Sequence, residues 1–159
     1  MRRSTPCSSR VQEQRQNVQQ LCGTLRVFAA VVADGSVVNW GDESHGGNSS
    51  EVQDQLQNVQ QVCATGGAFV AILANGSAVT WGIQFVGGGS PRVQHQLRNV
   101  QQICGTLVAF AAILEDRSVV TWGRPDYGGD SSRVQDQLRN AQQISCTASV
   151  ALGDGTVVT

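Results

Sequence analysis

The stretch Asp34-Gly35-Ser36-Val37-Val38-Asn39-Trp40-Gly41 decides the fold, because close variants of it return at a fixed interval along the 159-residue chain. The tryptophan of this stretch recurs every 41 residues, as Trp40, Trp81 and Trp122. A Gln-rich segment recurs at the same interval, and its copies begin at Val11, Val52, Val93 and Val134. Self-similarity at a fixed period indicates a tandem repeat. The predicted units are a lead-in over residues 1–10, repeats over 11–51, 52–92 and 93–133, and a partial repeat over 134–159.

Each repeat contains a predicted strand, a tight turn and a second strand. The stretch Phe28-Ala29-Ala30-Val31-Val32 is apolar at every position, which is typical of a strand covered on both faces. Asp34-Gly35 follows, and this dipeptide favours a two-residue hairpin turn. The third repeat has Asp116-Arg117 at the same place, so we expect a poorer turn there.

The Gln-rich segment is ambiguous between a helical turn and a strand. Val52, Leu56, Val59 and Val62 have the spacing of one helix face. The run from Val59 to Thr65 is equally compatible with an entering strand. We favour a helical turn over the Val-Gln-x-Gln-Leu part, followed by a strand from about Val59.

The Asp-Gly-x-Val-x-x-Trp-Gly core, its Gly-containing loop and the following apolar ladder resemble the repeat of the regulator of chromosome condensation family. That repeat forms blades of a β-propeller. The resemblance implies a mainly β fold in which the 41-residue repeats build an incomplete propeller, an open arc, with a short helical turn in each repeat. Two features depart from the family. The unit is shorter than usual, and Thr24-Leu25-Arg26-Val27-Phe28 replaces the family's Gly-x-x-His-Thr.

Charge and composition exclude several functional classes. Eleven basic and twelve acidic side chains give a net charge of -1, which argues against nucleic-acid binding. Without lysine, the chain has neither the Schiff-base nucleophile nor the P-loop cation. No apolar run approaches the ~20 residues of a membrane span. The first residues show no secretion signal, so we expect an intracellular protein, cytoplasmic or nuclear.

The sequence predicts no catalytic, cofactor or metal site. Cys22, Cys63 and Cys104 occupy one repeat position but lack the close spacing of metal ligands, and we expect them to be reduced packing residues. His45 and His95 do not recur and have no catalytic partners at a suggestive spacing.

Two sets of residues are assigned roles. The three tryptophans, each at the end of a strand, are predicted to be structural anchors between repeats. The polar positions of the Gln-rich segments form a candidate interaction surface, comprising Gln53, Asp54, Gln57, Gln94, His95, Arg98, Gln135, Asp136 and Arg139.

The sequence-based interpretation is a non-enzymatic protein-interaction scaffold, because extended repeat surfaces bind proteins. The alternatives implied by the resemblance are guanine-nucleotide exchange on a small GTPase, or a repeat fragment of a larger HECT-type ubiquitin ligase. Expected partners are therefore proteins, including a small GTPase or a component of the ubiquitin pathway. Because the terminal repeats of an open arc lack a neighbour, we also expect self-association or further repeats.

Overall fold

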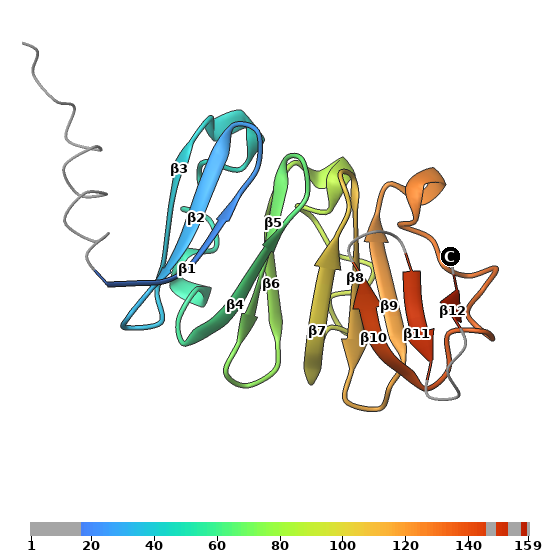
Figure 1. Ribbon diagram of the computed structural model, residues 1–159. Coiled ribbons are helices and arrows are strands. Elements are labelled where there is room, and N and C mark those ends of the chain that lie inside the picture. Colours follow the sequence, from blue (N-terminus) through green and yellow to red (C-terminus); the bar gives the residue numbers. More distant parts are fainter. Residues whose placement is uncertain (1–16, 146–148, 153–156, 159) are drawn as a thin grey trace, which may run out of the picture.

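The computed structural model describes residues 17–145, 149–152 and 157–158, which form four three-stranded antiparallel sheets. Figure 1 shows the sheets side by side in chain order, with the first and fourth at opposite ends of the row. This arrangement confirms the predicted open array of propeller-like sheets. The strands are β1 (Val18–Gly23), β2 (Val27–Val32) and β3 (Val37–Gly41); β4 (Val59–Ala64), β5 (Ala68–Leu73) and β6 (Ala78–Gly82); β7 (Val100–Gly105), β8 (Ala109–Leu114) and β9 (Val119–Gly123); and β10 (Ala141–Ser145), β11 (Ser149–Leu152) and β12 (Val157–Val158).

The loop between the second and third strands differs from the predicted two-residue turn. In the first sheet, Val32 N donates to Ser36 O at 3.0 Å and Gly35 N donates to Val32 O at 2.9 Å. These bonds enclose three loop residues, Ala33, Asp34 and Gly35, of which Gly35 alone has a positive φ, 79°. The prediction was wrong by one residue, because Asp-Gly also fits a three-residue loop that ends in the left-handed region.

The Gln-rich segments from Val52, Val93 and Val134 begin in the connectors between sheets, residues 42–58, 83–99 and 124–140, and continue into the next first strand. Most of the segment from Val11 lies outside the described residues. The first connector contains the 3₁₀ helix η3 (Gln53–Gln55), and β4 begins at Val59, as predicted. Residues 91–96 and 132–137 form turns at the corresponding places. Each connector ends on an asparagine with positive φ, which directs the chain into the next sheet: Asn58, Asn99 and Asn140.

Three further 3₁₀ helices follow the third strand of a sheet: η2 (Glu43–His45), η4 (Gln84–Val86) and η5 (Pro125–Tyr127). Each is closed by a glycine with φ between 96° and 107°, namely Gly46, Gly87 and Gly128. Within the described part of the chain, no helix is both long and apolar enough to cross a membrane.

The core consists of separate layers between neighbouring sheets. The layer between the first two sheets combines Val27, Val31 and Val37 with Phe69 and Trp81, which come from the second sheet. The next layer pairs Val70 and Ile72 with Phe110 and Trp122 in the same way, and a third layer lies between the third and fourth sheets. Every internal sheet is thus covered on both faces, as the uniformly apolar strands predicted. In β5, residues 68–72 are all buried.

Candidate interaction surfaces

All nine side chains of the predicted interaction surface lie on the connectors and are exposed. Three of them, however, hold the connector to its own sheet. Gln94 Oε1 accepts a hydrogen bond from Ser90 Oγ at 2.7 Å, and its Nε2 donates to Ala78 O at 2.9 Å. The same arrangement recurs with Gln53 and with Gln135. Their amide groups are therefore occupied by structural bonds.

The other six side chains project from these fixed connectors into solvent: Asp54, Gln57, His95, Arg98, Asp136 and Arg139. Arg139 Nη2 lies 3.0 Å from Asp136 Oδ1, but both side chains are so exposed that the pair contributes little to stability. Beside this pair is an open hollow of about 390 Å³, also lined by Arg117 and Asp116. The residue type changes between equivalent positions, so each connector presents a different charge.

A second surface, which the sequence did not predict, lies at the other end of the sheets. There the loop between the first two strands meets the 3₁₀ helix that follows the third, as shown by Ile83 N donating to Gly67 O at 2.9 Å. Four large apolar side chains of these two segments are exposed. Leu25 and Leu107, in loops between first and second strands, are 93% and 74% exposed, and Phe85 and Tyr127, in the 3₁₀ helices, are 82% and 59% exposed. We call them the apolar end. The only sequence signal was the presence of large apolar residues in predicted loops.

The tryptophans lie on the face that each sheet turns toward the preceding one. Trp81 stacks on Phe69 of the adjacent strand with a centroid distance of 5.3 Å, and Trp122 stacks on Phe110 at 5.2 Å. Trp81 and Trp122 are each 4% exposed, because the preceding sheet covers them. This burial agrees with a packing function and leaves little ring surface for a ligand.

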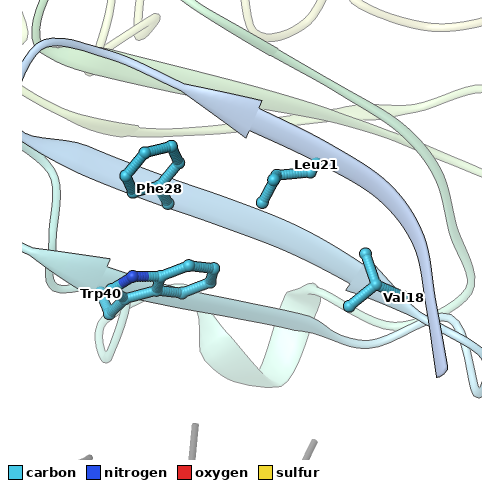
Figure 2. A pocket seen from close by; sticks show the side chains of 4 residues that line it. All are labelled: Val18, Leu21, Phe28 and Trp40. Atoms are coloured by element: carbon cyan, nitrogen blue, oxygen red, sulfur yellow. The ribbon is translucent and has the colours of Figure 1, made fainter. Parts of the chain in front are cut away.

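On the equivalent face of the first sheet, Val18, Leu21 and Phe28 are exposed. Phe28 and Trp40 stack at 5.6 Å, and with Val18 and Leu21 they line an open apolar hollow of about 430 Å³. Figure 2 shows these four side chains on one side of the three strands. We call this surface, defined by Val18, Leu21, Phe28 and Trp40, the aromatic face. The open array predicts uncovered apolar surface at its ends, but the sequence alone did not identify these residues.

One polar cluster has no counterpart in the other repeats. The Asp42 carboxylate accepts hydrogen bonds from Ser44 N at 3.0 Å and Ser44 Oγ at 2.5 Å, and it lies 3.0 Å from His45 Nδ1. The Ser44 hydroxyl, followed by His45, holds the pKa of the Asp42 carboxyl well below its usual range. These residue types also form hydrolase triads, where the two imidazole nitrogens contact different partners. Here His45 Nδ1 faces both Ser44 and Asp42, so the cluster lacks that relay geometry.

Cys22, Cys63 and Cys104 lie in the first strands of their sheets. Two of them, Cys22 and Cys63, have thiols of low reactivity. Cys22 and Cys63 are free and half-buried. Burial, together with the neighbouring Cys63, raises the pKa of Cys22 to about 11, and burial also raises the pKa of Cys63. Cys104 departs from the prediction of reduced thiols, because it is disulfide-bonded. No group of three or more metal-ligating side chains occurs among the described residues.

No family model matches the sequence, and no curated protein matches it either. Solved structures do share its fold. Human WBSCR16 superimposes with a TM-score of 0.50 at 22% identity, covering 67% of this chain and 34% of WBSCR16. Yeast RCC1 (Prp20), solved bound to Kap60, gives a TM-score of 0.53 at 16% identity, covering 69% of this chain and 30% of Prp20. A computationally designed protein, Ika4, gives 0.50 at 17% identity and covers 90% of both chains.

These similarities define the class of the protein by its fold. The chain consists of propeller-like blades of the kind found in RCC1. It spans about a third of the length of WBSCR16 and of Prp20.

Proposed function

We propose that the chain is a non-enzymatic protein-interaction scaffold whose binding surface is the apolar end. The observation that carries this proposal is the exposure of Leu25, Phe85, Leu107 and Tyr127 on loops held by a rigid frame. Large apolar side chains gathered on one end of a molecule are typical of a protein-binding site, because burying them against a partner is favourable. Loops on a rigid scaffold are also where binding residues concentrate.

The frame beneath these loops is fixed by a threonine bond that recurs in the first three units. Thr65 Oγ1 accepts from Ala68 N at 3.1 Å and donates to Val86 O at 3.0 Å, which ties the loop to the following 3₁₀ helix. Thr24 and Thr106 accept from the corresponding strand residues, Val27 and Ala109. A preorganised loop loses little conformational entropy on binding, which favours affinity.

The test compares two surfaces on the same protein. Partners are captured from cells with the tagged chain, with the double variant Phe85→Ser/Leu107→Ser, and with the charge reversal Arg98→Glu/Arg139→Glu. We expect the first variant to lose the partners that the unmodified chain and the charge reversal both retain. If only the charge-reversal variant loses the partners, the binding surface lies on the connectors and not at the apolar end. If both variants retain the partners, neither surface is the binding site.

Guanine-nucleotide exchange on a small GTPase is a second candidate, because Prp20p, a protein of similar fold, binds Gsp1p. The crystal structure of Prp20p from Saccharomyces cerevisiae was described together with its binding properties to Gsp1p and histones. The present chain shares 14% identity with Prp20p and covers 31% of it, so this activity is a proposal for a longer protein. Release of a fluorescent guanine nucleotide from a Ran-type GTPase at catalytic amounts of the chain would support it.

A further inference from the structure

The first strand of each sheet carries an exposed glutamine at a β-bulge. In the register of β1 with β2, Val18 faces Val32 and Gln20 faces Val31, so Gln19 is the extra residue of the bulge. The same shift occurs in the first strands of the other three sheets. A bulge redirects its side chain out of the regular alternation of the strand. The four extra residues, which we call the bulge glutamines, are Gln19, Gln60, Gln101 and Gln142, and all four are exposed.

The side-chain amides of the bulge glutamines are free for a ligand. Within the described part of the chain, none of the four forms a side-chain hydrogen bond. They differ in this respect from Gln53, Gln94 and Gln135, whose amides hold the connectors to their sheets. Each bulge glutamine therefore offers one donor group and one acceptor group to solvent.

The next residue of the same strands shows what a glutamine amide binds at this place. Gln20 Nε2 donates to Val62 O at 2.9 Å, and Val62 N donates to Gln20 Oε1 at 2.9 Å. Gln102 forms the same two bonds with the backbone of Ile144, at 3.2 and 3.3 Å. One glutamine amide thus pairs with both the N–H and the C=O of one residue in an extended strand.

The bulge glutamines occupy equivalent positions on four neighbouring strands. The sheets stand side by side in chain order (Figure 1), and Cα atoms of neighbouring first strands approach one another to within 8 Å. Two residues of an extended chain span ~6.6 Å, and every second residue directs its N–H and C=O toward the same edge. An extended segment that crosses the first strands therefore presents the backbone groups of about one residue to each strand.

The surface around this row is neutral. The residues of β1, β4, β7 and β10 include no acidic and no basic side chain. Charge on these strands therefore neither attracts nor orients a ligand, and hydrogen bonding determines which group is held. The peptide group matches a free glutamine amide, as the bonds of Gln20 and Gln102 demonstrate within the chain itself.

We propose that the bulge glutamines bind an extended, neutral segment of a protein partner through its backbone. Each glutamine amide pairs with the N–H and the C=O of one partner residue. Recognition of this kind depends on the main chain of the partner and tolerates changes in its side chains. The row lies on the first strands and is distinct from the apolar end, so the proposal does not depend on the proposed function.

The test measures binding of a defined peptide to the full chain by fluorescence anisotropy. The probe is a fluorescein-labelled peptide of about ten residues, alternating threonine and serine, which is neutral and long enough to cross four strands. A second peptide of the same sequence is N-methylated at every second residue, which removes the donors along one edge. We expect the unmethylated peptide to bind at least about tenfold more tightly than the methylated one, because unmade hydrogen bonds are costly.

A triple variant tests the residues themselves. Gln19→Ala/Gln60→Ala/Gln101→Ala removes three of the four amides, and it should weaken binding of the unmethylated peptide by at least about tenfold. Because the three side chains are exposed and unbonded, the variant should retain the free energy of unfolding of the unmodified chain. Urea denaturation checks this.

Two control variants restrict the effect to the row. Gln55→Ala/Gln96→Ala/Gln137→Ala removes exposed glutamines from the connectors and should leave peptide binding unchanged. Phe85→Ser/Leu107→Ser should also retain it, which separates this surface from the apolar end. The proposal would be overturned by a lack of binding at millimolar peptide, by equal affinity for the methylated peptide, or by unchanged affinity in the first triple variant. Equal losses in the two triple variants would also contradict it.

Discussion

The indole Nε1 of Trp122 donates a hydrogen bond to Gly87 O at 3.2 Å, and the equivalent bond from Trp81 is missing. Among the described residues, Trp81 Nε1 is buried without a hydrogen-bond partner. The acceptor at the matching position is Gly46 O, which instead accepts from Asn39 Nδ2 at 2.8 Å. The third sheet avoids this competition, because the residue that corresponds to Asn39 in the second sheet is Thr80.

This difference predicts unequal effects for the same substitution at the two tryptophans. Trp122→Phe removes a satisfied donor and leaves Gly87 O unpaired, whereas Trp81→Phe removes a buried donor that has no partner. We expect Trp122→Phe to lower the free energy of unfolding by about 1–3 kcal/mol more than Trp81→Phe. Urea denaturation of the two variants measures the difference. Equal losses would show that Trp81 Nε1 has a partner in solution.

The third hairpin loop predicts a stabilising substitution. Arg117 has a φ of 69° at the position where Gly35 and Gly76 have 79° and 81°. The hydrogen bond that this residue accepts from the next sheet is also longer: Ala141 N lies 3.1 Å from Arg117 O, whereas Val59 N and Val100 N lie 2.8 Å from their glycine acceptors. Glycine tolerates this conformation, although it also gains entropy in the unfolded chain.

We therefore expect Arg117→Gly to raise the free energy of unfolding by about 0.5–1 kcal/mol. Thermal or urea unfolding measures the change. Gly76→Ala is the reciprocal control and should destabilise the protein, because its Cβ would lie 2.9 Å from the Cα of Asn99. A loss of stability in Arg117→Gly would indicate that the guanidinium contributes more than the backbone strain costs.

Gln20 links the first two sheets, and its removal should lower the free energy of unfolding. Gln20→Ala would leave both backbone groups of Val62 without their side-chain partners. We expect a cost of about 1–3 kcal/mol, since unpaired buried polar groups are costly. Gln60→Ala is the control, because Gln60 is exposed on the neighbouring β4, and it should change stability by less than about 0.5 kcal/mol. Equal effects would make the inter-sheet bonds energetically unimportant.

The repeat pattern predicted most of the backbone because it combines local signals with a strict period. Uniformly apolar runs such as 28–32 became central strands, and the Trp-Gly pairs marked where β3, β6 and β9 end. The loop length was missed because Asp-Gly fits two hydrogen-bond registers that differ by one residue. Only the hydrogen bond from Val32 N to Ser36 O across the loop distinguishes them.

The candidate surfaces were less predictable, because exposure depends on which neighbour is present. Trp40 and Trp81 occupy the same repeat position before a glycine, yet Trp40 lies beside an open hollow and the layer between the first two sheets buries Trp81. Similarly, Gln53 was predicted as a binding residue from its polarity. Its bonds to Ser49 and Val37 depend on how the connector folds back onto β3.

The Cys22 thiol predicts a dependence of reactivity on pH. Its pKa is raised to about 11 by burial and by the nearby Cys63, so the nucleophilic thiolate is scarce at pH 8. We expect iodoacetamide to modify Cys22 at least about a hundredfold more slowly in the folded chain than in the urea-unfolded chain at pH 8. Mass spectrometry of the Cys22 peptide over time measures both rates.

The same shift has a defined effect on stability. An unfolded cysteine ionises near pH 9, whereas folded Cys22 holds its proton to about pH 11. Its contribution to stability is therefore complete below pH 9 and is lost as the pH rises toward 11. Cys22→Ser, which does not ionise in this range, should reduce the decline in the free energy of unfolding between these pH values. A decline of the same size in the variant, or rapid modification of folded Cys22 at pH 8, would show that the thiol is accessible and has an ordinary pKa.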